Sequence, residues 1–179
     1  RDILDKENPF VVLRLDNPTQ GRKYSQLKGS TTHIYIPPRL DIKSAERLVI
    51  VEGEFKAMAL WQRGIPAVGI KGFSGCGSPG KPGELHAELR ALLECGKNLQ
   101  AIEFLGDTDT VINKEFGGAA AALVAGLAKL ERDFEIMLPI LPFAGPKGID
   151  DCFEAWGKDS LNKWEGLERI KLDSETHPN

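Results

Sequence analysis

The chain alternates short apolar runs with segments of helical periodicity from about residue 46 onward. The apolar runs span residues 47–51, 65–70, 101–105 and 134–141. The helical segments span residues 55–63, 84–95, 118–131 and 149–156. Strands and helices of these lengths in alternation pack as a parallel sheet with helices on both faces. The pattern therefore predicts an α/β fold of the Rossmann-like kind.

The first 45 residues follow a different pattern. Their short apolar runs, separated by turn residues, lie at 10–15, 22–27 and 33–36. These runs predict a small β-rich lobe over residues 1–45, ahead of an α/β domain at 46–157. Residues 158–179 are expected to form a tail that adds at most one helix.

Residues 72–83 are rich in Gly and Pro and are therefore predicted to be a loop. Lys71 comes directly before this stretch, and Lys81 lies near its end. The segment lacks the GxxxxGK[ST] spacing of a phosphate-binding P-loop. Anion binding here stays an alternative to an ordinary surface loop.

Acidic residues follow two of the apolar runs. Glu52 ends the first run, and Asp107 and Asp109 follow the third. Because parallel strands end at the same edge, where open α/β sheets keep their sites, these carboxylates are expected to converge. Hard oxygen ligands suit Mg²⁺ or Mn²⁺, and Mg²⁺ typically serves phosphate chemistry. The pattern predicts a metal-dependent domain that acts on phosphodiesters or nucleotides.

Ordinary structural roles are also open to these residues. Glu52 could complement a helix dipole, and an Asp-x-Asp pair also occurs in plain turns. Asp150 or Asp151 could cap the following helix, while the other reaches the metal cluster. Lys56 falls in the first turn of a predicted helix, where a cation is unfavourable. We therefore expect Lys56 to face the carboxylates or a bound phosphate.

The net charge of −3 is unusual for a nucleic-acid binder, but the charge is uneven. Residues 10–40 contain five basic residues and one acid. Arg22, Lys23 and Lys28 in this stretch, together with Lys71, are candidate contacts to nucleic-acid phosphates. The alternative is a solvated hairpin with ordinary surface lysines.

The three cysteines and three histidines are widely spaced, and no CxxC pair occurs. This spacing argues against a zinc site and a disulfide framework, and it favours a reducing cytoplasm. No apolar run approaches the roughly 20 residues of a membrane span. Because the first residue is Arg and not Met, we expect the chain to be a piece of a longer protein.

The acidic segments, in this order, resemble the Toprim domain of bacterial-type primases, topoisomerases and some nucleases. The matching segments are Leu-Val-Ile-Val-Glu-Gly at 48–53, Leu-Gly-Asp-Thr-Asp at 105–109 and Lys-Gly-Ile-Asp-Asp at 147–151. The resemblance covers roughly residues 46–156. It implies that Glu52 is a metal ligand or general acid/base and that Asp107 and Asp109 hold Mg²⁺. Primases usually carry Asp at the position of Lys56.

The resemblance, together with the basic lobe, implies a domain of a phage or plasmid replication protein that assists primer synthesis. The expected partners are single-stranded DNA, nucleotides and further domains such as a helicase. The expected catalytic residues are Glu52 and Lys56, and the expected metal ligands are Glu52, Asp107, Asp109 and Asp150. The alternatives are a Toprim-type nuclease and a non-catalytic DNA-binding or docking module in which Lys56 neutralises the acids.

Overall fold

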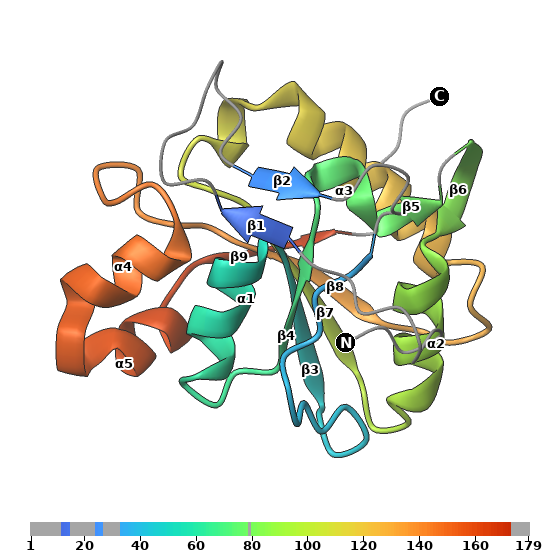
Figure 1. Ribbon diagram of the computed structural model, residues 1–179, viewed down its shortest axis with the longest axis horizontal. Helices are drawn as coiled ribbons and strands as arrows, with labels where there is room; N and C mark the ends of the chain where they lie inside the picture. Colours follow the sequence, from blue (N-terminus) through green and yellow to red (C-terminus); the bar gives the residue numbers. More distant parts are fainter. Residues whose placement is uncertain (1–11, 15–23, 27–32, 79, 173–179) are drawn as a thin grey trace.

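The computed structural model describes residues 12–14, 24–26, 33–78 and 80–172 of the 179-residue chain. A five-stranded sheet with the strand order β4-β3-β7-β8-β9 forms its centre (Figure 1). These strands are β3 (Arg47–Glu52), β4 (Ala67–Ile70), β7 (Ala101–Leu105), β8 (Glu135–Pro139) and β9 (Arg169–Leu172). All pair in parallel except β9, which is antiparallel to β8. The predicted α/β class with a mostly parallel sheet is confirmed.

Helices cover both faces of this sheet (Figure 1). One layer holds α1 (Glu54–Trp61), α4 (Ile149–Trp156) and α5 (Ser160–Glu165), and the other holds α2 (Ala87–Cys95) and α3 (Lys114–Leu127). Along β3, Val49 and Val51 pack in the first layer, whereas Leu48 and Ile50 pack in the second. Because both faces are buried, the strand reads as a continuous apolar run.

Within the predicted N-terminal lobe the structure describes residues 12–14, 24–26 and 33–45, and the strands β1 (Val12–Arg14) and β2 (Tyr24–Gln26) pair antiparallel. Both lie within predicted strands. The third predicted strand, at 33–36, is reduced to one bridge between Tyr35 and Gly69 of β4. Ile34 is buried in the core of the main sheet. Residues 33–36 of the predicted lobe therefore pack directly on the α/β sheet.

The prediction of a loop at 72–83 is wrong, and so is the predicted start of the next helix at residue 84. The segment contains a short 3-10 helix, η1 (Phe73–Cys76), and the hairpin strands β5 (Gly77–Ser78) and β6 (Lys81–Leu85). Leu85 is buried against α3, so it extends the strand instead of opening the helix. The helix α2 begins after His86, whose side chain accepts a hydrogen bond from the N–H of Glu88.

Two further differences concern helix starts and the C-terminal end. The helix α3 begins at Lys114, one turn before the predicted residue 118, because the Asn113 side chain caps it through the N–H of Glu115. Its preceding loop contains the 3-10 turn η2 (Thr110–Ile112).

After α4, whose bounds match the prediction, the chain forms η3 (Gly157–Asp159) and α5 and then returns to the sheet as β9. No helix in the described ranges has the length and apolar content needed to cross a membrane.

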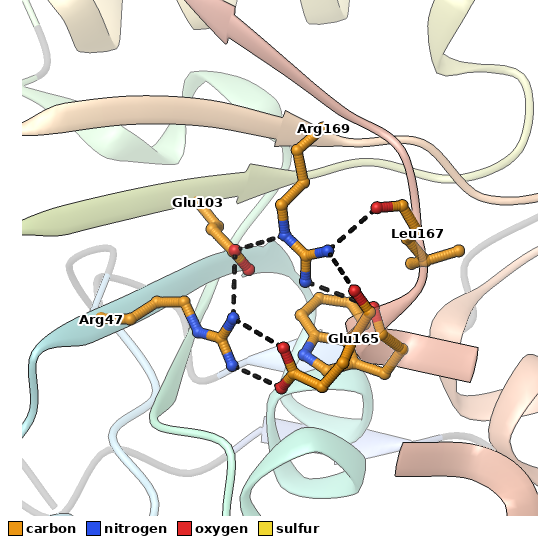
Figure 2. A network of polar contacts seen from close by, with 6 residues as sticks. Arg47, Glu103, Glu165, Leu167 and Arg169 are labelled. Atoms are coloured by element: carbon orange, nitrogen blue, oxygen red, sulfur yellow. Dashed lines mark hydrogen bonds and ion pairs between the residues drawn. The ribbon is translucent and has the colours of Figure 1, made fainter. Parts of the chain in front are cut away.

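A buried ion-pair network fixes β9 and α5 to the sheet (Figure 2). Glu103 of β7 is fully buried, and its Oε1 accepts a hydrogen bond of 2.7 Å from Arg169 Nε. Arg47 lies 3.5 Å from the same oxygen and also binds Glu165 through two hydrogen bonds. Arg169 further donates to the backbone carbonyl of Leu167. The apolar pattern of β7 did not predict this network, because a single Glu inside an apolar run carries no local signal of its partners.

Candidate functional site

The candidate site lies at the carboxyl edge of the sheet, where β3 and β7 end side by side. Val51 pairs with Leu105, so the residues just beyond this pair emerge next to each other. A pocket of about 740 Å³ opens at this edge. Its polar walls are formed by Glu52, Asp107, Asp109, Asn113, Glu115 and Lys147. We call it the acidic pocket, and it gathers the three carboxylates that the sequence predicted to converge.

Two glycines let the chain turn sharply after Glu52. Gly53 has a φ of 94°, which side chains rarely adopt, and its N–H donates to the carbonyl of Ile70 at 2.9 Å. A Cβ on Gly69 of the neighbouring strand would stand 2.7 Å from the Gly53 carbonyl oxygen. The Glu-Gly turn therefore needs a glycine on both strands to place Glu52 at the pocket.

The electrostatics of Glu52 connect it to the other charges of the pocket. Burial raises the pKa of Glu52 above its ordinary value, and the charges of Asp107 and Asp109 raise it further. Lys56 and Lys147 lower the same pKa. A carboxylate with a raised pKa takes up a proton more readily, which suits a residue that assists proton transfer.

We expect Glu52→Gln to stabilise the metal-free protein at pH 7. The folded-state pKa of Glu52 lies above its ordinary value of 4.5, so the cost of its buried charge appears as pH rises through the interval between the two values. The neutral amide avoids this cost, and Tm should rise by about 1–3 °C. The difference should vanish near pH 4, where both side chains are neutral. Thermal unfolding followed by circular dichroism in chelator checks this, and a lower Tm for the variant at pH 7 would contradict it.

Two lysines contact the aspartates in different ways. Lys56, from the first turn of α1, binds Asp107 Oδ1, and these side chains are 19% and 13% exposed. Lys147 Nζ lies 3.9 Å from Asp107 Oδ2 and 3.7 Å from Asp109 Oδ2, and its side chain is 67% exposed. The expectation that Lys56 faces the carboxylates is confirmed. Lys147 was not among the predicted site residues, although it belongs to the third acidic segment.

Asp150 lies beside the Lys56–Asp107 ion pair. A Cβ placed on Gly148 would stand 2.6 Å from Asp150 Oδ1, 2.9 Å from Lys56 Cε and 3.6 Å from Asp107 Oδ1. The predicted capping of α4 by Asp150 or Asp151 is wrong, because Gly148 is the N-cap and no side chain caps this helix. Instead Asp150 Oδ1 is buried and has no hydrogen-bond partner among the described residues. Asp150 therefore lies close to the ion pair, but it is not among the residues that line the acidic pocket.

The loops that carry the acids are tied together by backbone contacts. The N–H of Thr108 donates to the carbonyl of Lys147 at 3.0 Å, joining the loop after β7 to the loop before α4. Below them, burial raises the pKa of the Cys152 thiol to about 11, and the charges of Asp151, Asp150 and Asp107 add to this rise. A thiol with so high a pKa stays protonated near neutral pH and is a poor nucleophile. The chemistry of the site therefore rests on its carboxylates and lysines.

The potential ligands in the acidic pocket are mainly carboxylate oxygens, the type that a hard divalent cation prefers. Within residues 33–78 and 80–172 and the two short N-terminal strands, no group of three His, Cys, Asp or Glu side chains is arranged to hold a metal ion. However, Lys147 Nζ lies within 4 Å of one oxygen from each of Asp107 and Asp109, so this position already attracts a positive charge. Mg²⁺ usually keeps several waters and needs only one or two carboxylates. These residues therefore fit a hard, partly hydrated cation.

The predicted nucleic-acid contacts are only partly described. Lys71 directly follows β4, at the same sheet edge as Glu52. It lines a second pocket of about 510 Å³ together with Lys81 and the glycines of the β5–β6 hairpin. Both pockets share Ser74, Gly77 and Ala122 as wall residues. Arg22, Lys23 and Lys28 lie outside the described residues.

Comparison with known proteins gives one match. The family model described as "Domain of unknown function (DUF3854)" matches residues 42–160, which include β3 to α4 and all the residues of the acidic pocket. No curated protein and no solved structure matches the chain.

Proposed function

We propose that this chain, which belongs to the DUF3854 family, is a Toprim-like, Mg²⁺-dependent domain of a phage or plasmid replication protein that assists primer synthesis on single-stranded DNA. The observation that supports this most is the meeting of Glu52, Asp107 and Asp109 in one pocket, although they come from two strands far apart in the sequence. Oxygen donors at the carboxyl edge of a parallel sheet are suited to a cation that binds phosphates.

The three carboxylates that converge in the acidic pocket, and the ion pair beside them, have roles in this proposal. Asp107 and Asp109 would hold Mg²⁺ or Mn²⁺, and the bound cation would offset the negative charge of the nucleotide phosphates. Glu52, with its raised pKa, accepts the proton of the attacking 3′-hydroxyl as its oxygen bonds to the α-phosphorus and pyrophosphate leaves. Lys56 fixes Asp107 in place, and Asp150 lies close to this ion pair.

The proposed partners are single-stranded DNA, nucleotides and further domains, such as a helicase, of a longer parent protein. Lys71 and Lys81 line a pocket that continues from the acidic pocket, where they contact the phosphates of the DNA strand. Arg22, Lys23 and Lys28 contribute to the same strand in this proposal. We also propose a cytoplasmic location, which suits the three free cysteines Cys76, Cys95 and Cys152.

A second candidate function is a non-catalytic DNA-binding or docking module. The observation that favours it is the ion pair between Lys56 and Asp107, in which a lysine already neutralises one of the acids. In this case the pocket needs no metal ion. Divalent cations then leave Tm unchanged, whereas a true metal site raises it by mass action.

A single gel assay tests the proposed function. End-labelled single-stranded DNA and labelled ribonucleotides are incubated with the protein, with Mg²⁺, with Mn²⁺ or with chelator. We expect new metal-dependent oligonucleotides that contain the labelled ribonucleotides. Metal-dependent shortening of the DNA would instead identify a nuclease of the same Toprim type.

Asp133→Asn is the matched control in this assay for a substitution of Asp107 or Asp109. Asp133 is exposed and lies outside the acidic pocket, yet its substitution changes the net charge by the same amount as a substitution of Asp107 or Asp109. The control should retain all products. If neither product appears while the protein binds DNA and its Tm does not respond to Mg²⁺, the catalytic proposal fails and the docking module is supported.

A further inference from the structure

Two lysines, Lys147 of the acidic pocket and Lys56 beside it, engage different oxygens of one aspartate. Lys56 binds Asp107 Oδ1, and Lys147 approaches Asp107 Oδ2 at 3.9 Å. Lys147 also approaches Asp109 Oδ2 at 3.7 Å, so its ammonium group is held between two carboxylates. Each oxygen of the Asp107 carboxylate therefore lies near a different lysine.

The surroundings of the two ammonium groups differ as well. Lys56 is largely buried. A Cβ placed on Gly148 would stand close both to Lys56 Cε and to Asp150 Oδ1, an oxygen that has no hydrogen-bond partner in the part of the chain that the structure describes. A buried charge that loses its partner raises the free energy of the folded protein. Separating Lys56 from Asp107 is therefore unfavourable. Lys147 is mostly exposed, and both of its contacts are longer than a hydrogen bond. An exposed ion pair of this length contributes little and can be displaced.

We infer that Lys56 is a permanent internal cation and Lys147 an exchangeable one, so that the pocket accepts a single divalent ion in place of Lys147, with Asp107 and Asp109 as the residues that would hold it. This inference rests on the proposed metal site. It adds the number of ions that the site binds, and it identifies Lys147 as the group that competes with the ion. It also explains why a lysine occupies the first turn of α1, where the helix dipole disfavours a cation. The lysine offsets the charge that a second metal ion would otherwise offset.

The inference is tested by counting the Mn²⁺ ions bound per chain, using titration calorimetry and electron paramagnetic resonance of free Mn²⁺. The wild-type protein is expected to bind one ion. Lys56→Met keeps a side chain of similar shape without the charge, frees Asp107 Oδ1 beside Asp150, and is expected to bind two. Lys147→Met removes only the competitor and should bind one ion with about 5-fold higher affinity.

The control is Lys171→Met, because Lys171 is exposed and pairs with Glu135 on the sheet away from the pocket. It should bind Mn²⁺ as the wild-type protein does. Two ions in the wild-type protein, or unchanged affinity in Lys147→Met, would overturn the inference, and neither readout depends on Lys56→Met being stable. Because no catalytic activity is measured, a failure of the proposed primer synthesis would be seen separately in the gel assay.

Discussion

Glu103→Ala is expected to lower the free energy of unfolding by about 3–5 kcal/mol, the usual loss when one partner of a buried ion pair is removed. Glu103 is the fully buried member of the network in Figure 2, and Arg169 and Arg47 both direct their guanidinium groups at its Oε1. Without the carboxylate, Arg169 remains largely buried beside the sheet with an uncompensated charge. Chemical unfolding in urea, followed by circular dichroism, measures the loss.

The matched control for this substitution is Glu165→Ala. Glu165 also binds Arg47, but its side chain is 55% exposed, so its loss should cost less than about 1 kcal/mol. Similar losses in the two variants would contradict the assignment of Glu103 as the centre of the network. Since the network joins β7 to β9 and lies outside the acidic pocket, Glu103→Ala should retain Mn²⁺ binding at temperatures where it stays folded.

Asp107→Asn combined with Asp109→Asn is expected to reduce Mn²⁺ affinity by about 100-fold or more and to abolish any metal-dependent product in the gel assay. The change removes both negative charges that attract the cation but keeps the shapes of the side chains. An amide oxygen can still accept a hydrogen bond from Lys56, so the protein should stay folded, although it loses the charge of the Lys56–Asp107 ion pair. Titration calorimetry with Mn²⁺ and far-ultraviolet circular dichroism give the two measurements.

Asp151→Asn serves as the control for this double variant. Asp151 is exposed on α4, next to Asp150, and is not part of the acidic pocket, so its substitution should leave Mn²⁺ affinity within about 2-fold. If the double variant were to bind Mn²⁺ as tightly as the wild-type protein, the metal site would have to lie elsewhere. A variant that lost its circular dichroism signal would instead show that Asp107 is needed for folding.

Much of the fold could be predicted from local patterns. The apolar runs predicted β3 and β7 closely, and the bounds of α4 agree with the prediction. Predictions failed where a tertiary contact overrode composition. The Gly- and Pro-rich segment forms the β5–β6 hairpin because Leu85 is buried against α3, and no local pattern shows that contact.

The candidate site, like the fold, could be predicted from the sequence only in part. The position of Glu52 at a strand end and the spacing of Asp107 and Asp109 are local properties, and they were sufficient to identify these acids. The contact of Lys56 with Asp107 was anticipated only as a general attraction to negative charge. Which oxygen it binds, and the presence of Lys147 on the other one, depend on how three loops meet in space.

By itself, the sequence determined the alternation of strands and helices and the acidic residues at the strand ends, because apolar periodicity and turn chemistry act over a few neighbouring residues. Only the tertiary structure decided that β3 lies beside β7, which brings Glu52 to Asp107, and that Glu103 is buried between Arg47 and Arg169. These pairings join residues more than 50 positions apart. Strand order and the packing of helices on the sheet select such partners, and neither leaves a signal in the residues nearby.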